Sequence, residues 1–163
     1  MTSHINDNPS TAPAPAGSRQ AAGMPLPYGA PISLAQAKQV MAAAEEEAAR
    51  HGWPMVIAIV DSTGHLLMLH RFDQAQFASV EIAQGKAQTA VNFRRATKTF
   101  EETIAAGGQG LRLLGVHNMV PLEGGVPLVV DGAVVGAIGV SGMQSTQDAQ
   151  VAHAGARALV ESK

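Results

Sequence analysis

The sequence contains no cysteine. This absence excludes disulfide bonds, thiolate catalysis and every metal site that relies on cysteine ligands. Aromatic residues make up only 4% of the chain, whereas hydrophobic residues as a whole make up 46%. We therefore expect one domain with a core built mainly from small aliphatic side chains.

Positive charge is also scarce, and no stretch of the chain concentrates it. Lysine and arginine together number 11, against 13 acidic residues, which gives a formal net charge of -2. Nucleic-acid phosphates need clustered cations, so we expect no nucleic-acid partner. No run reaches the roughly 18 uninterrupted apolar residues of a membrane-spanning helix, so we expect no membrane partner.

The first 27 residues are rich in proline, alanine, serine and asparagine and show no apolar periodicity. A secretory signal needs a basic start and a continuous apolar stretch of roughly 7–15 residues, and this segment has neither. We therefore predict a disordered arm over 1–27, a domain over 28–163 and a cytoplasmic location.

The first part of the domain predicts a helix followed by a hairpin. Ser33 and Gln36 form a capping-box pattern for a helix that ends near Gly52. The apolar run MVIAIV (55–60) suits a strand covered on both faces. A turn and a returning strand follow, and alternation along that strand places His70 on the inward side.

The second part predicts helices, then further strands. Ser79 is expected to cap a helix over 79–93, and Thr99 with Glu102 a short one. An extended piece near Met119 and a hairpin turning at Asp131-Gly132 follow, and a last helix starts at Ser145. Neighbouring hairpins with helices between them predict an α+β fold with an antiparallel sheet.

Glycines are concentrated around the second hairpin. Gly136 and Gly139 lie inside its second strand, where glycine marks either a bulge or the close approach of another group. Gly124 and Gly125 precede its first strand and can present successive N–H groups to an anion. Gly85, inside the predicted 79–93 helix, suggests close approach of another backbone or of a ligand.

Three segments together resemble the GlcG/HbpS-like family, whose members are described as haem-binding or haem-degrading proteins: ASVEIAQGKAQTAVNF (78–93), EGGVPLVVDG (123–132) and GAIGVSGMQSTQDAQVAHAG (136–155). The resemblance runs from about Ile32 to the C-terminus. It implies a profilin-like α/β sandwich with a five-stranded antiparallel sheet flanked by helices. It also implies haem as the cofactor and a homo-oligomer ranging from dimer to octamer.

Carried over by position, the family's recurrent polar residues fall on Glu81, Lys86, Thr89, Thr97, Glu123, Gly124 and Gly125. The chain departs from the family pattern in two places. Ala96 stands where the family usually has proline, which makes the entry to the short helix less rigid. The export signal of the secreted haem sensors is missing, so an extracellular role does not transfer.

Haem requires an axial donor, an apolar slot and cations for its propionates. His70 and His117 are the preferred donors, because one is expected to point inward and the other lies beside the glycine loop. Lys86, Arg94 and Arg95 could meet the propionates. We therefore expect haem or a comparable small ligand in a pocket between the 79–93 helix and the 123–127 loop. The expected ligand-binding residues are His70, Lys86, Thr89, Thr97, His117, Glu123, Gly124 and Gly125. No metal-ion site is expected, since no histidine pair has a diagnostic spacing.

Two alternatives remain open at this point. Glu81, Lys86 and Glu123 could form the acid–base site of a hydrolase, deaminase or tautomerase that acts on an organic acid or a reactive catabolic intermediate. Glu81 and Lys86 lie five apart on one helix and project about 140° from each other, which weakens a simple dyad. The other alternative is a ligand-free oligomeric scaffold that uses its small residues for subunit packing.

Overall fold

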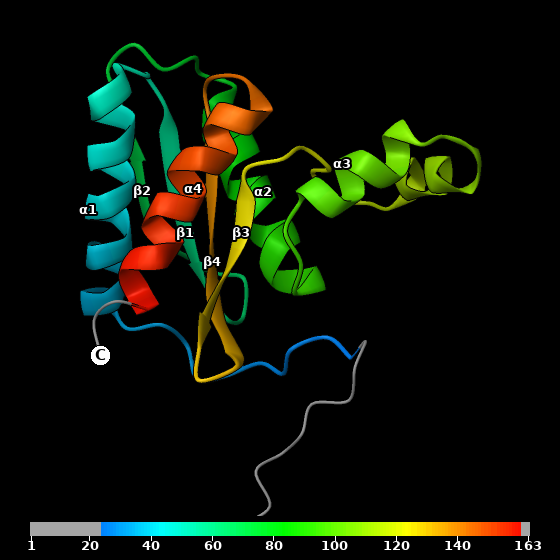
Figure 1. The fold of residues 1–163 in the computed structure, drawn as a ribbon, viewed down its shortest axis with the longest axis horizontal. Coiled ribbons are helices and arrows are strands. Elements are labelled where there is room, and N and C mark those ends of the chain that lie inside the picture. The colour runs from blue at the N-terminus through cyan, green and yellow to red at the C-terminus, as the bar shows by residue number, and fades with distance from the viewer. Residues whose placement is uncertain (1–23, 161–163) are drawn as a thin grey trace, which may run out of the picture.

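Residues 24–160 are described by the computed structural model (Figure 1). The elements follow in the order α1 (Leu34–His51), β1 (Val56–Asp61), β2 (Leu66–Arg71), α2 (Ser79–Phe93), α3 (Lys98–Ala105), the 3-10 helix η1 (Gly108–Gly115), β3 (Gly125–Val130), β4 (Ala133–Ser141) and α4 (Ser145–Val160). The four strands form one antiparallel sheet in the order β2-β1-β4-β3. Helices α1 and α4 cover one face and α2 covers the other (Figure 1). The predicted α+β class and the antiparallel sheet are confirmed.

The predicted five strands are wrong, because the sheet in the described part of the chain has four. The expected extended piece near Met119 lies in a loop rather than in a strand. The backbone N–H of Val120 donates to the Thr89 hydroxyl of α2 at 2.9 Å. The loop therefore makes this hydrogen bond to a helix side chain instead of to a neighbouring strand.

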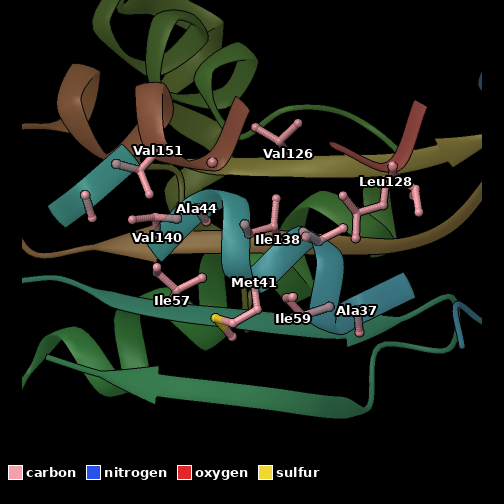
Figure 2. Close-up of a cluster of buried hydrophobic side chains, with 14 of the residues drawn as sticks. Ala37, Met41, Ala44, Ile57, Ile59, Val126, Leu128, Ile138, Val140 and Val151 are labelled. Atoms are coloured by element: carbon pink, nitrogen blue, oxygen red, sulfur yellow. The ribbon is translucent and has the colours of Figure 1, made fainter. Parts of the chain in front are cut away.

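The core lies on both faces of β1, as the unbroken apolar run predicted. Ile57 and Ile59 pack with Met41 of α1 and Ile138 of β4, which Figure 2 shows together. Val60, on the opposite face, packs with the small residues of α2. Because successive side chains of a strand point to opposite faces, β1 contributes to apolar clusters on both faces of the sheet.

Gly139 of β4 lies directly beneath α2. A Cβ atom at this position would contact the carbonyl oxygen of Ala83 and lie 2.5 Å from the backbone nitrogen of Ala87. The glycine thus lets the helix backbone approach the sheet, which is a packing role. The hairpin turn is as predicted, since Asp131 and Gly132 have φ of 49° and 77°, the left-handed pair of a type I′ turn.

One of the three predicted helix caps is confirmed. Ser33 and Gln36 form the capping box of α1. The Ser79 cap is wrong: Ser79 lies inside α2, and its hydroxyl is hydrogen-bonded to Ser141 on β4 at 3.0 Å. The Thr99 cap is also wrong, since the residue before α3 is Thr97. The Thr97 hydroxyl accepts a hydrogen bond from the Gly125 N–H and makes none to the helix.

Packing begins before the predicted domain boundary at residue 28. Leu26 packs against the apolar cluster beneath α2, and the carbonyl oxygen of Pro27 accepts a hydrogen bond from Val134 at 2.8 Å. Arg94 donates to the Leu26 carbonyl oxygen at 3.0 Å and lies over the Tyr28 ring. Residues 1–23 of the predicted arm lie outside the described residues.

Across residues 24–160, no helix is both long enough and apolar enough to cross a bilayer. The cytoplasmic location stays a prediction.

Candidate functional site

Helix α2 and the Glu-Gly-Gly loop are in contact where the sequence motifs indicated a site. A Cβ atom at Gly125 would contact the carbonyl oxygen of Lys86. A Cβ atom at Gly124 would lie 2.9 Å from the Lys86 ammonium nitrogen, and Gly124 has a φ of +124°. Both glycines therefore allow the loop to pack directly on α2, with Lys86 beneath it.

Lys86 forms a buried ion pair that no sequence pattern indicated. Its Nζ atom lies 2.8 Å from Asp148 Oδ2 of α4 and donates to the Val140 carbonyl oxygen at 2.9 Å. The two charged side chains are only 2% and 4% exposed. Burial raises the pKa of the Asp148 carboxyl, while the Lys86 ammonium acts in the opposite direction.

Asp148 also holds the loop that precedes α4, because its other carboxylate oxygen accepts the Met143 backbone N–H at 3.0 Å. The sequence showed only an acidic residue near a helix start, a position that ordinarily serves the helix. No local pattern links it to a lysine 62 residues earlier.

Thr89 and Thr97 hold the loops around this ion pair. The Thr97 hydroxyl accepts the Gly125 N–H at 2.8 Å, and the Thr97 N–H donates to the Gly125 carbonyl oxygen at 3.0 Å. Thr89 donates to the carbonyl oxygen of Gly85 and accepts from Val120. Val120 occupies the space over Gly85, where an added Cβ atom would contact its side chain.

The junction between α2 and the Glu-Gly-Gly loop is therefore closed. Lys86, Thr89, Thr97, Gly124 and Gly125 are all buried and contact one another or the adjoining loops. A ligand could reach them only by displacing part of the chain.

The three predicted catalytic residues have separate surroundings. Glu123 pairs with Lys98 of α3 at 3.0 Å, and its backbone N–H donates to the Glu101 carboxylate. The neighbouring Glu123 carboxylate raises the pKa of Lys98. Glu81 is exposed at the start of α2, and Lys86 is buried against Asp148. The pairing of Lys86 with Asp148 and of Glu123 with Lys98 does not favour an acid–base site built from the three.

The two preferred histidines both lie at the surface. His117 is exposed in the segment that joins η1 to the glycine loop. The inward position predicted for His70 is wrong: its side chain is 47% exposed, and its Nδ1 atom lies 2.6 Å from the Glu45 carboxylate of α1. Because β2 is an edge strand, the His70 side chain lies at the margin of the sheet rather than in the core.

The predicted propionate partners are also differently placed. Lys86 is buried in its ion pair, and Arg94 is engaged with Leu26 and Tyr28. Arg95 remains exposed.

Large apolar side chains surround His117 in the sequence and are exposed. The segment from η1 to the loop projects away from the sheet together with α3 (Figure 1). Its exposed apolar residues are Leu111, Leu114, Val116 and Leu122. Leu114 is 66% exposed. Several exposed apolar side chains in one short segment are more typical of a binding surface than a single exposed leucine is. This surface lies next to the closed junction, which it contacts through Val120.

Comparison with known proteins agrees with this architecture. The model of the family described as haem-degrading protein HbpS-like matches residues 32–157. Protein GlcG of Escherichia coli K12 is 43% identical over 110 residues, which cover 68% of this chain and 81% of GlcG.

Two solved structures share the fold. A double mutant of Streptomyces reticuli HbpS is 31% identical, with a TM-score of 0.73 over 91% of this chain and 97% of that one. The PduOC:haem complex is 32% identical, with a TM-score of 0.72 over 78% of this chain and 94% of that one. The family match, which spans most of the chain, shows what the three sequence motifs indicated: this protein belongs to the HbpS-like family.

Proposed function

We propose that this protein binds haem, and that the haem lies on the outer side of the junction between α2 and the Glu-Gly-Gly loop. Two lines of support come from relatives: the family is described as haem-degrading, and a homologous domain of PduO has been crystallised as a haem complex. The observation that carries the position is the exposed apolar segment around His117.

The closed junction supports a position on its outer side. Opening the space under the loop would break the hydrogen bonds between Thr97 and Gly125 and uncover the Lys86–Asp148 ion pair, which costs folding free energy. The outer surface carries no such cost. The buried residues predicted as ligand contacts, namely Lys86, Thr89, Thr97, Gly124 and Gly125, therefore support the surface from beneath rather than touch the ligand.

The residues of the outer surface fit the chemistry of haem. His117 supplies an exposed imidazole as the axial donor. The four exposed apolar side chains between Leu111 and Leu122 supply a surface for the macrocycle. Arg112, which is also exposed, supplies a cation for a propionate, while Lys98 is already paired with Glu123. When bound, haem would supply a redox-active iron.

His70 is the competing donor. Its hydrogen bond to Glu45 resembles the carboxylate partner that commonly orients a metal-bound histidine and raises its basicity. Its other ring nitrogen would then be the ligand. The experiment therefore has to separate these two histidines.

Titration of the purified protein with hemin tests the proposal. We expect a saturable shift of the Soret band, which His117→Ala removes. His70→Ala and His153→Ala are the matched variants, since each removes an exposed imidazole elsewhere in the fold. Loss of the shift in His70→Ala alone would move the site to the β2 edge, and a weak, non-saturating response of the wild type would contradict haem binding.

We also infer that the protein is a homo-oligomer in which a second copy helps to cover the apolar segment. An exposed surface of this kind is typical of an interaction site, and haem lying on it would still expose one face to water. Light scattering coupled to size-exclusion chromatography, with and without hemin, measures the mass. A monomer under both conditions would contradict this inference.

A further inference from the structure

A cavity with no part in the haem proposal lies where α1 and β2 end. Its volume is about 320 Å³, and its lining includes Gly52, Trp53, Pro54, Phe72, Asp73 and Gln74. Helix α1 lies on one side of the molecule, whereas α3 and the segment that follows it project on the other (Figure 1). The cavity is thus separate from the surface around His117.

The aromatic walls of this cavity are held in place by the fold. Gly52 ends α1 in the left-handed conformation, with a φ of 66°, and so turns the chain back. The Trp53 N–H then donates to the Ala48 carbonyl oxygen at 3.0 Å. The Trp53 ring stacks on the His51 ring with the centroids 4.2 Å apart. The orientation of the indole is therefore fixed before any ligand binds.

The fold also holds Phe72, the second aromatic residue of the lining. The Phe72 N–H donates to the Met55 carbonyl oxygen at 3.0 Å, which extends the pairing of β2 with β1 by one residue. Phe72 packs against the main apolar core. A preformed apolar cavity of this kind costs little conformational entropy to fill.

The charge in the lining of the cavity is negative. Asp73 is the charged residue in the lining, and Gln74 adds an amide. The C-terminal end of α1 also contributes partial negative charge. Arg50, the cation of that helix end, is already paired with Glu46 and Glu47. The site therefore favours a ligand that carries a positive charge or several N–H donors.

We propose that this cavity binds a small planar aromatic cation of the amidine class. The ring contacts Trp53 and Phe72, and the charged group pairs with Asp73. The volume lies at the lower end of the range for ligand sites, which suits one or two rings and is too small for haem. No residue of this site belongs to the proposed haem surface, so each proposal can fail without the other.

Trp53 makes the test direct, because it is the single tryptophan of the chain. Benzamidine is the probe, and benzoate and benzyl alcohol are controls with the same ring and a negative or no charge. We expect a saturable change in tryptophan fluorescence with benzamidine and a much weaker response to both controls. Ligand-observed saturation-transfer NMR gives a second readout that does not depend on quenching.

Asp73→Asn is the decisive variant, because the residue is exposed and its loss leaves the core intact. We expect it to weaken benzamidine binding by about tenfold, in line with the loss of a charge-assisted hydrogen bond. Asp131→Asn, in the β3–β4 turn, is the matched control and should bind as the wild type does. Equal responses to all three compounds, a response that never saturates, or an unchanged affinity in Asp73→Asn would overturn the proposal.

Discussion

Replacing Lys86 with methionine tests the physical account of the closed junction most sharply. Methionine keeps most of the side-chain volume but leaves the Asp148 carboxylate buried without its partner. The lost interactions are an ion pair at 2.8 Å and a hydrogen bond to Val140 at 2.9 Å, made by side chains that are nearly inaccessible to water. Breaking such a buried pair typically costs about 3–5 kcal/mol of folding free energy.

The cost should depend on pH in a defined direction. Burial already raises the pKa of Asp148 above its ordinary value of 3.8, and removing Lys86 takes away the interaction that opposes this rise. The folded state of Lys86→Met then holds the proton more tightly than the unfolded state does. The part of the penalty that comes from charging Asp148 is therefore absent well below pH 3.8 and grows as the pH rises above that value.

Chemical denaturation followed by circular dichroism measures these free energies. Lys98→Met is the matched control, since it breaks an ion pair with Glu123 at the surface, and its unfolding midpoint should stay near that of the wild type. The double variant Lys86→Met/Asp148→Asn removes both charges and keeps an acceptor for Met143. It should recover a substantial part of the loss. Strictly additive single effects, or a Lys86→Met variant as stable as Lys98→Met, would contradict a stabilising role for the buried ion pair.

Three further predictions concern other parts of the molecule. Gly139→Ala should destabilise the fold by at least about 2 kcal/mol, because its Cβ atom would press into the α2 backbone. Gly115→Ala is the control: its Cβ atom would meet no other atom within 4 Å, so its thermal unfolding should be nearly unchanged. The pKa of Glu47 is lowered mainly by the hydrogen bond that Gln150 of α4 donates to it. The Glu47 carboxylate should therefore stabilise the protein at neutral pH and lose that effect as the pH falls through and below 4.5. A Glu47→Gln variant whose melting temperature falls with acid in the same way as that of the wild type would contradict this. Leu114→Glu should lower the mass found by light scattering, because it places a charge in the exposed apolar segment. Leu34→Glu is the control, since it changes another exposed leucine, on α1, and should leave the mass unchanged. Equal masses for both variants and the wild type would count against an interface on η1.

Several local patterns predicted the local structure, although the caps expected at Ser79 and Thr99 did not form. The Ser33 capping box, the Gly52 helix end and the Asp131-Gly132 turn each depend on a few adjacent residues, and all three are present. The run from Met55 to Val60 was unambiguous because every side chain in it is apolar, and all of it is buried. Short-range physics was sufficient in these places.

Long-range partners could not be predicted in the same way. Lys86 looked like a surface or ligand-binding lysine because Asp148 lies on a different helix, and only the folded sheet brings the two together. Thr97 appeared to be a family-related polar residue, and its hydrogen bonds to Gly125 depend on the same packing. The alternation rule gave His70 a face of the sheet but not its position at the edge, which depends on strand order.

Hydrogen–deuterium exchange with and without hemin tests the proposed haem position, because it reports where on the chain the ligand acts. If haem lies against the surface around His117, residues 108–122 should gain protection on hemin binding. The β2 edge near His70 should then be unchanged. Protection confined to the α1–β2 side, with no change over 108–122, would contradict the proposed site.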